Sequence, residues 1–191
     1  MFVRSVRSAL TLLVAMTLLL GIVYPLLITG ISKLAFPRQA TGSLIHVDGK
    51  LLGSSLIGQS FSDPKYFWGR PSATSPQPYN GLASGGSNLG PLNPALIDAV
   101  KTNVKALRDA DPDNREPIPV DLVSASASGL DPEISSAGAH YQAARVARAR
   151  HLPIPQVEAL IQAHEQGRLL GVIGEPRVNV LELNLALDRI H

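Results

Sequence analysis

The sequence predicts an α+β protein: a single N-terminal transmembrane helix, followed by one mixed α+β soluble domain with a β-hairpin and about four helices. Three observations carry this prediction. An uncharged apolar stretch covers residues 8–32. An Asp-Gly pair separates two short apolar runs within residues 44–57. From residue 93 onward, apolar residues repeat at helical spacing behind residues that commonly cap helices.

Charge is distributed unevenly along the 191 residues and excludes one class of function. The chain has 17 Lys and Arg against 15 Asp and Glu, but Arg4 and Arg7 are the only charged side chains among the first 32 residues. Residues 33–191 therefore carry 15 basic and 15 acidic side chains and no net charge. A nucleic-acid-binding domain is expected to have a basic excess, so we expect no nucleic-acid partner. The absence of Cys rules out disulfides and thiolate metal sites.

The segment at residues 8–32 predicts a membrane-spanning helix. It has no charged residue, and 13 of its 25 residues are Leu, Ile or Val. A helix of this length measures about 37 Å, enough to cross a hydrocarbon core of about 30 Å with some tilt. Gly21 and Pro25 are unfavourable in a soluble helix, but a bilayer tolerates them where neighbouring helices or local adjustments satisfy the freed carbonyls. A signal peptide cleaved near Ser32 is the alternative, and the long apolar run favours the uncleaved anchor.

Basic residues flank both ends of this segment, so charge alone does not orient it. Arg4 and Arg7 precede the apolar run, while Lys33 and Arg38 follow it. The positive-inside rule is therefore balanced unless the terminal amine is counted on the N-terminal side. We predict, in order, a short cytoplasmic N-terminus at residues 1–7, a transmembrane helix at residues 8–32 and an exported, periplasmic soluble domain at residues 33–191.

Two segments follow the anchor. The pair Asp48-Gly49 predicts a β-hairpin, because a type I′ turn needs positive φ at both central residues. From Ser60 to Gly90 the sequence is rich in Gly, Pro, Ser and Asn. Five of the nine aromatic residues of the chain lie in this second segment: Phe61, Tyr66, Phe67, Trp68 and Tyr79. Disordered segments are poor in aromatic residues, so we expect an ordered loop with a functional role.

Caps and apolar stripes predict four helices in the second half of the chain. The first begins at Pro94, behind Asn93, and the second begins at or just after Ser135 and ends near Arg150. The third covers Pro155–Gln166, with Gly167 as its C-cap. The fourth begins after Asn179. A short strand is expected at Val120–Ser124. The last segment also alternates in the manner of a strand, which is the alternative to a final helix.

The loop Ser84–Asn88, with the sequence Ser-Gly-Gly-Ser-Asn, is the first candidate binding element. Its amides and hydroxyls are of the kind that hold an anion. It is not a Walker A loop, because no Gly-Lys-Ser/Thr ending supplies a phosphate-binding lysine. A glycine-rich turn packed against the aromatic residues is the alternative interpretation and requires no ligand.

No catalytic or metal-binding pattern stands out. Ser126 or Ser128, with His140 as a general base, would suit a serine hydrolase, but the sequence has no Gly-x-Ser-x-Gly elbow. A small-residue turn whose side chains cap backbone amides is the alternative for these serines. The five histidines form no His-Glu-x-x-His pair, and we assign neither a catalytic residue nor a metal ligand.

Arginines are the remaining candidates. Arg145, Arg148 and Arg150 predict a solvent-exposed helix face. Arg70 lies inside the aromatic loop, where its guanidinium can stack on a Tyr or Trp ring or pair with a carboxylate. We regard Arg70 as the charged residue most worth testing.

Taken together, these segments resemble the C subunit of the Kdp-type potassium-transporting ATPases. The resemblance covers nearly the whole chain. The matching stretches are Tyr24–Leu27, Gly53–Gln59 with Phe61, Tyr66-Phe67, Gly69–Ala73, Tyr79-Asn80, Ser84–Leu89, Val123–Asp131, Arg145–Ala147 with Ala149-Arg150, and Val178–Asp188.

The resemblance implies a single-pass subunit of the inner (plasma) membrane that has no enzymatic activity alone. Its implied partners are a channel-like potassium-binding subunit and a P-type subunit that hydrolyses ATP, in a complex that imports potassium. The family's subunit is described as a catalytic chaperone that raises the ATP affinity of the hydrolysing subunit. No tightly bound cofactor is implied, and ATP is used by the partner.

The resemblance also implies site residues. The loop Ser84–Asn88 (Ser84, Gly85, Gly86, Ser87 and Asn88) is likened to the signature loop of ABC transporters and is the candidate nucleotide contact, although Ser87-Asn88 replace the Gln of that signature. Candidates for partner interfaces are Tyr24, Pro25, Phe67, Arg70, Tyr79 and Asn80. Because ATP is cytoplasmic, an exported domain cannot contact it, and the domain would then order the complex and shape the mouth of the potassium pathway.

Two other functions stay open at this stage. One is a membrane-anchored, exported serine hydrolase that uses Ser126 or Ser128. The other is a generic exported adhesion or interaction domain. Dependence of growth on this chain at very low external potassium separates the transport function from both.

Overall fold

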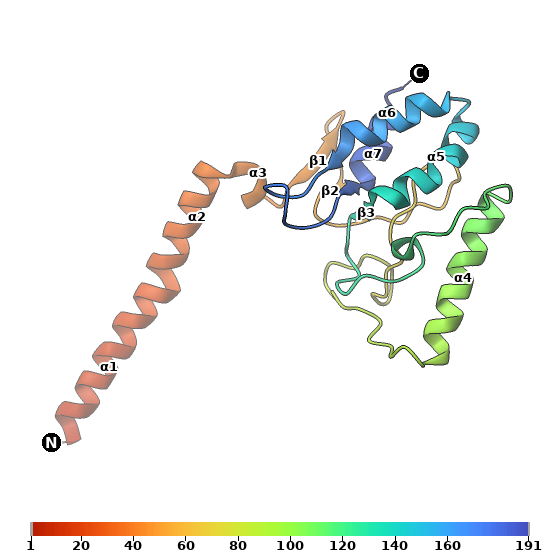
Figure 1. Cartoon of the computed structure of the whole chain (residues 1–191). Helices are drawn as coiled ribbons and strands as arrows, with labels where there is room; N and C mark the ends of the chain where they lie inside the picture. Colours follow the sequence, from red (N-terminus) through yellow and green to blue (C-terminus); the bar gives the residue numbers. More distant parts are fainter. Residues whose placement is uncertain (1, 191) are drawn as a thin grey trace. The chain divides into compact units, whose positions relative to one another are not determined.

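The computed structural model describes residues 2–190 and falls into two units, Met1–Gly53 and Ser54–His191 (Figure 1). The elements, in chain order, are α1 (Phe2–Leu18), the π-helical turn η1 (Leu19–Val23), α2 (Tyr24–Ala35), α3 (Pro37–Ala40), β1 (Leu44–Val47), β2 (Lys50–Ser54), α4 (Pro94–Ala110), the 3₁₀ turn η2 (Val120–Leu122), β3 (Glu133–Ser135), α5 (Ser136–Arg150), α6 (Ile154–His164), β4 (Glu165–Gln166), β5 (Arg177–Asn179) and α7 (Val180–Leu187). The predicted fold class, one apolar N-terminal helix followed by a mixed α+β region, is confirmed.

The first unit begins with a helix that is continuous from Phe2 to Ala35, a length of 34 residues, and none of the residues in its most apolar stretch is buried. By length and composition this helix can cross a membrane, in agreement with a single-pass membrane protein. Its middle widens into a π-turn, where the Tyr24 N–H donates to the Leu19 carbonyl five residues earlier. Pro25 follows at once, and because its ring would clash with the carbonyl four residues before it, the wider turn lets the helix continue through the proline.

The same unit ends in the predicted hairpin. Strands β1 and β2 form a two-stranded sheet. The two residues between them, Asp48 and Gly49, have φ values of 49° and 74°. Both central residues are thus in the left-handed region that a type I′ turn requires, and the hairpin prediction is confirmed.

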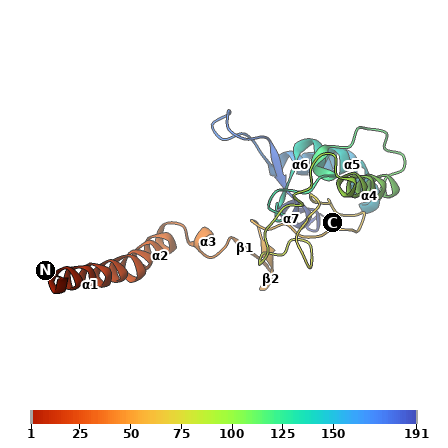
Figure 2. The same ribbon diagram turned by 90° about the horizontal axis from the view of Figure 1, so that it is seen from below.

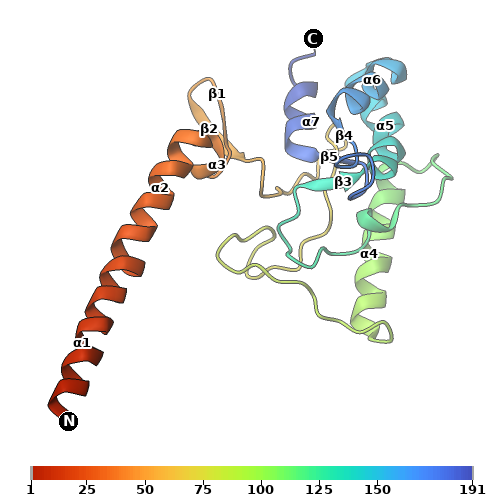
Figure 3. The same cartoon turned by 60° about the vertical axis from the view of Figure 1, so that its left-hand side comes forward.

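The core of the second unit is a small antiparallel sheet joined end to end to three helices. The strand order is β3-β5-β4. Strand β3 runs directly into α5, α6 runs directly into β4, and β5 runs directly into α7, so the sheet lies at one end of each helix (Figure 3). Helix α6 packs against both α5 and α7. Ile134 of β3 pairs with Val178 of β5, and both are buried.

Side chains from the three helices and from β3 and β5 meet in one apolar core. Its largest fully buried apolar members are Phe67, Ile134, Val146, Val157, Ile161, Val178, Leu183 and Leu187. Phe67 is the exception among them, because it comes from the long loop and not from a helix or strand. The loop therefore contributes to the core that stabilises the domain.

Three predicted helix caps are present. The Asn93 side chain accepts a hydrogen bond from the Ala95 N–H at the start of α4, at 3.0 Å. Ser135 accepts from the Gly138 N–H at the start of α5, at 2.9 Å. Asn179 accepts from the Glu182 N–H at the start of α7, at 3.0 Å. Each cap satisfies an amide that the first turn of its helix leaves without a partner.

Two local predictions are wrong. The segment Val120–Ser124 is not a strand but a 3₁₀ turn, in which the Ser124 hydroxyl donates to the Val120 carbonyl at 2.7 Å and thereby stabilises a turn. The predicted helix Pro155–Gln166 ends at His164, because the next two residues pair with β5 as strand β4. Gly167 is consequently not its C-cap.

The final segment combines both patterns that the sequence offered. Residues Arg177–Asn179 are the strand β5, and Val180–Leu187 are the helix α7. The preferred helix is confirmed, and part of the alternation belongs to the strand before it. Asn179 ends the strand and caps the helix, so one residue marks the change.

Candidate functional site

The segment between β2 and α4 has no helix or strand among the residues that the structure describes, yet buried polar contacts hold it in place. The Phe67 N–H donates to the Asn184 Oδ1 atom at 2.8 Å, and the Asn184 Nδ2 atom donates back to the Phe67 carbonyl at 3.0 Å. Gln142 does the same for the next residue: its Oε1 atom accepts from the Trp68 N–H at 2.8 Å, and its Nε2 atom donates to the Trp68 carbonyl at 3.1 Å.

These two side chains, which we call the amide clamps, replace a strand partner for the loop. Asn184 and Gln142 are each 1% exposed, so their amide groups are shielded from water. A buried backbone N–H or C=O without a partner is costly, and the clamps supply both partners to two successive residues. The aromatic residues of the loop predicted that it is ordered, but the amide clamps were not predicted.

Arginines from α5 close the same part of the loop. The Arg145 guanidinium lies 4.5 Å from the centre of the Trp68 ring and donates to the Tyr66 carbonyl at 3.1 Å and to Gln142 Oε1 at 2.7 Å. Burial lowers the pKa of Arg145 to about 10, which leaves it charged at neutral pH. Arg150 lies 4.8 Å above the Tyr66 ring.

The predicted solvent-exposed arginine face is therefore wrong. Arg145 is 3% exposed, and Arg150 pairs with Asp188 at 2.7 Å. Arg148 alone keeps an exposed side chain, and it pairs with the buried Asp111. The missed signal was the aromatic loop itself, because Tyr and Trp rings are the surfaces on which guanidinium groups stack.

Arg70 pairs with a carboxylate, one of the two contacts that the sequence left open. Its Nη1 atom lies 3.1 Å from Asp131 Oδ2, and both side chains are about a quarter exposed, at 27% each. Its Nη2 atom donates to the Ala125 carbonyl at 3.4 Å. The positive charge of Arg70 is thus already balanced by a partner 61 residues away in the chain.

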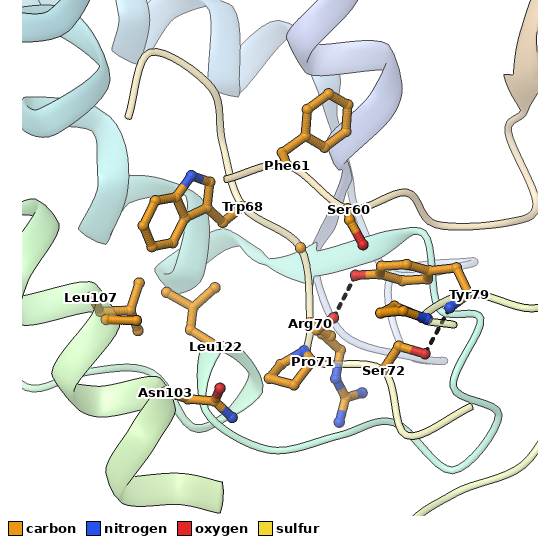
Figure 4. Close-up of a pocket in the computed structure, with 13 residues that line it drawn as sticks. Ser60, Phe61, Trp68, Arg70, Pro71, Ser72, Tyr79, Asn103, Leu107 and Leu122 are labelled. Carbon is orange, nitrogen blue, oxygen red and sulfur yellow. Dashed lines mark hydrogen bonds between the residues drawn. The ribbon is translucent and has the colours of Figure 1, made fainter. Parts of the chain in front are cut away.

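Tyr79 is hydrogen-bonded to two other residues of the loop (Figure 4). Its hydroxyl donates to the Arg70 carbonyl at 2.5 Å, and its N–H donates to the Ser72 hydroxyl at 2.9 Å. Its ring lies so close to Gly58 that a Cβ atom there would be 2.4 Å from the ring. Burial, together with the Asp131 carboxylate, raises the pKa of Tyr79 to about 12.

The neighbouring Asn80 is held in the same way. Its N–H donates to the Thr74 hydroxyl, and its side chain donates to the Ser75 carbonyl, both at 3.0 Å. Two of the predicted interface residues, Tyr79 and Asn80, thus have polar contacts inside the domain. Their part in contacts with another subunit stays a prediction.

A pocket of about 300 Å³ opens between this loop and α4 (Figure 4). Its walls combine aromatic rings with a few polar groups: Ser60, Phe61, Trp68, Gly69, Arg70, Pro71, Ser72, Pro78, Tyr79, Asn103, Ala106, Leu107 and Leu122. Arg70 is the only charged residue in this lining, and it is already paired with Asp131. The pocket therefore offers little net charge to a polyphosphate or to a free cation.

The loop Ser84–Asn88 packs against a second loop. The Gly85 N–H and the Ser84 hydroxyl both donate to the Ser128 carbonyl, at 2.9 and 3.1 Å. A Cβ atom on Gly86 would lie 3.0 Å from the Ala127 carbonyl oxygen. The structure thus brings together two serine-rich segments that the sequence analysis considered separately. Ser87 and Asn88 remain exposed, and nucleotide contact by this loop stays a prediction.

Each group of the alternative hydrolase makes its own separate contact. The Ser126 hydroxyl accepts from the Gly129 N–H at 2.9 Å, and the Ser128 hydroxyl accepts from the Leu130 N–H at 3.1 Å. His140 pairs instead with Glu158 through its Nδ1 atom. Both serines therefore cap backbone amides in a turn, which is the alternative interpretation that the sequence offered for this segment. Within the same residues no group of three or more His, Asp or Glu is placed to hold a metal ion.

The last two interface candidates, Tyr24 and Pro25, lie in the long helix. Tyr24 is 55% exposed and begins α2 directly after the π-turn. An irregular helical turn of this kind can contact another helix in a membrane. This role also stays a prediction.

The fold and the loop define a class of protein: an N-terminal helix able to cross a membrane, joined to a small α+β domain whose charged and aromatic groups are used for internal packing. Comparison with known proteins identifies the family. The family described as "K+-transporting ATPase, c chain", KdpC, matches residues 6–189, and this chain belongs to it. It is the family of an accessory subunit and not of the catalytic chain, as the sequence analysis expected.

Individual relatives agree with this assignment. A protein of Dechloromonas aromatica is 64% identical over 184 residues, which is 96% of this chain and 96% of that protein. A protein of Variovorax paradoxus is 66% identical over 183 residues, which is 96% of this chain and 95% of that protein. A protein of Methylococcus capsulatus is 61% identical over 188 residues, which is 98% of this chain and 99% of that protein. Each of the three is called "Potassium-transporting ATPase KdpC subunit".

Proposed function

We propose that this chain is the noncatalytic, membrane-anchored subunit of an ATP-driven potassium import complex, and that it assists the assembly and turnover of that complex. The observation that carries the proposal is the family match over residues 6–189, which includes both the helix and the domain. The structure supports it in one further respect. The serines and the histidine of the alternative hydrolase are engaged in separate contacts, at Gly129, Leu130 and Glu158.

The proposed partners are a channel-like subunit that binds potassium and a P-type subunit that hydrolyses ATP. The helix Phe2–Ala35 would lie among the membrane helices of these partners. Its π-turn and Pro25 leave one turn irregular, and partner helices can satisfy backbone groups there. Surrounding lipid would cover the remaining apolar side chains, which are exposed in the isolated chain.

We place the N-terminus in the cytoplasm and the domain on the outer face of the inner membrane, in the periplasm. Arg4 and Arg7 precede the apolar run of the helix, and basic residues are common on the cytoplasmic side of membrane helices. In this orientation ATP stays with the partner, and the domain acts by ordering the complex at the mouth of the potassium pathway. The uncharged balance of residues 33–191 agrees with this role, because a strongly charged domain would attract or repel cations before they reach the channel.

Growth at very low external potassium tests the function. Cells that lack this chain but keep the other subunits should fail to grow, and the full-length chain should restore growth. The tagged chain, extracted in mild detergent, should co-purify with two larger membrane proteins, and the chain alone should show no ATP hydrolysis. Growth without the chain, or hydrolysis by the chain alone, would overturn the proposal.

A reporter fused after the last residue tests the orientation. Alkaline phosphatase is active only when exported, and green fluorescent protein folds well only in the cytoplasm. We expect activity from the first and no fluorescence from the second. The opposite result would place Ser84–Asn88 on the side of ATP and would favour direct nucleotide contact by this loop.

A further inference from the structure

The segment between β4 and β5 is a loop that projects from the domain (Figure 2). It carries four exposed apolar side chains. Leu169, Leu170, Val172 and Ile173 are 65%, 85%, 74% and 59% exposed. Scattered apolar residues are common on protein surfaces, but a cluster of four large ones within five positions of one loop is not. None of the contacts described above uses them.

The loop has a defined shape. The Leu169 N–H donates to the Ile173 carbonyl at 2.8 Å, and the Ile173 N–H donates back to the Leu169 carbonyl at 3.0 Å, so the tip is a closed turn. Gly171 and Gly174 have φ values of 77° and 85°, which a side chain would disfavour. The two ends of the loop continue into β4 and β5, so this projection, which we call the apolar tip (Leu169–Ile173), is fixed to the core sheet.

The charged residues at the base of the loop are paired with one another. Arg168 lies 2.7 Å from Glu175, and Arg177 lies 2.8 Å from Glu133 on the neighbouring strand. The base of the loop is therefore polar and has no net charge, whereas the tip is apolar. A protein interface commonly has this composition, with an apolar centre that is surrounded by polar residues.

From these observations we infer that the apolar tip inserts into an uncharged, apolar groove on another protein subunit of the same complex. The inference rests on the proposed function, because it takes the occupant to be another subunit. Two features favour a protein groove over a lipid surface. The loop has no Trp or Tyr, the residues that anchor proteins at the lipid headgroups. Arg168 in the loop and Arg177 in β5 each face an acidic partner, so the base of the loop has no net positive charge to attract anionic lipid.

Charge placed at the tip tests the inference. In the full-length chain, L170D and V172D should each reduce the amount of partner subunits that co-purify by about tenfold or more, since truncation or charging of a buried anchor commonly has effects of this size. L92D is the matched control: Leu92 is 91% exposed and belongs to the segment before α4 and not to the loop between β4 and β5, so this variant should co-purify as the wild type does. The thermal unfolding temperature of each variant should stay within a few degrees of the wild type, because the changed side chains are exposed.

A photo-crosslinking amino acid in place of Leu170 identifies what covers the tip. We expect a crosslink to a larger subunit of the complex, in membranes that contain the wild-type set of subunits. Crosslinks only to lipid, or only to a second copy of this chain, would overturn the inference, as would normal co-purification of both charged variants. If the wild-type chain itself co-purified with no other subunit, the proposed function would fail first, which keeps the two failures distinct.

Discussion

Single residues determine how closely the long loop can approach the rest of the domain. Tyr79 is the clearest case, because its ring fills the space above Gly58 and its hydroxyl reaches the Arg70 carbonyl. From the sequence, Arg70 was selected as a charged residue of the aromatic loop and Tyr79 as one of its aromatic rings, and Gly58 lies within the stretch Gly53–Gln59 that matches the family. The close contact between Gly58 and Tyr79 was not predicted, because the two residues lie 21 positions apart and only the folded chain brings them together.

Gly58→Ala should destabilise the domain by at least about 2 kcal/mol. The added Cβ would lie 2.4 Å from the Tyr79 ring and 2.6 Å from the Asp131 carbonyl oxygen, and the latter is backbone that cannot turn aside. Urea unfolding of the detergent-solubilised chain measures the change, with fluorescence from Trp68, the single Trp, as the signal. Gly90→Ala is the control, because nothing lies within 4 Å of its Cβ position. Equal stabilities of the two variants would contradict the described packing.

Tyr79 also predicts a dependence of stability on alkaline pH. Its pKa is about 12 in the folded chain against an ordinary value of 10.0, so the folded state holds this proton more tightly than the unfolded state. The resulting stabilisation is complete below pH 10 and is lost as the pH rises from 10 to about 12. Between pH 9 and pH 11 the free energy of unfolding should therefore decrease more in the wild type than in Y79F. The difference between the two proteins isolates Tyr79, because the buried Arg145 titrates in both. Parallel pH profiles would mean that the Tyr79 hydroxyl is not buried as described.

At the scale of elements, the sequence predicted what depends on neighbours in the chain. The hairpin turn at Asp48-Gly49 and the caps at Ser135 and Asn179 are local patterns, and all three are present. Strand β4 was missed because it consists of two residues whose partners lie on β5. The amide clamps were missed for the same reason: Gln142 and Asn184 lie 74 and 117 residues from the backbone groups that they bind.

Removal of a clamp should weaken the whole domain. Asn184→Ala leaves the N–H and the carbonyl of Phe67 without partners in a buried site, which should cost about 2–5 kcal/mol. Gln142→Ala should act similarly through Trp68. Gln162→Ala, an exposed position on α6, is the control and should change the free energy of unfolding by less than about 0.5 kcal/mol. Urea unfolding gives all three values, and a loss below 1 kcal/mol for both clamp variants would show that the loop is held by other contacts.

At the scale of the whole molecule, the sequence predicted the long apolar helix and the family. It did not predict which charged residues make contacts inside the domain. A resemblance spread over many motifs identified the family, and the match over residues 6–189 confirms it. Composition showed that residues 33–191 have no net charge, and the structure shows where several of the basic side chains are used. Arg70, Arg145 and Arg150 are paired or stacked inside the domain, so they stabilise its loop and do not form a basic surface.

The central claim is that this chain supports the chemistry of another subunit and performs none itself. Potassium-stimulated ATP hydrolysis measures this directly, in complexes purified from cells with and without the chain and in the purified chain alone. We predict potassium-stimulated hydrolysis by the complete complex, a large loss of it in the complex that lacks the chain, and no hydrolysis by the chain alone. Undiminished activity in the absence of the chain, or turnover of ATP by the isolated chain, would contradict the claim.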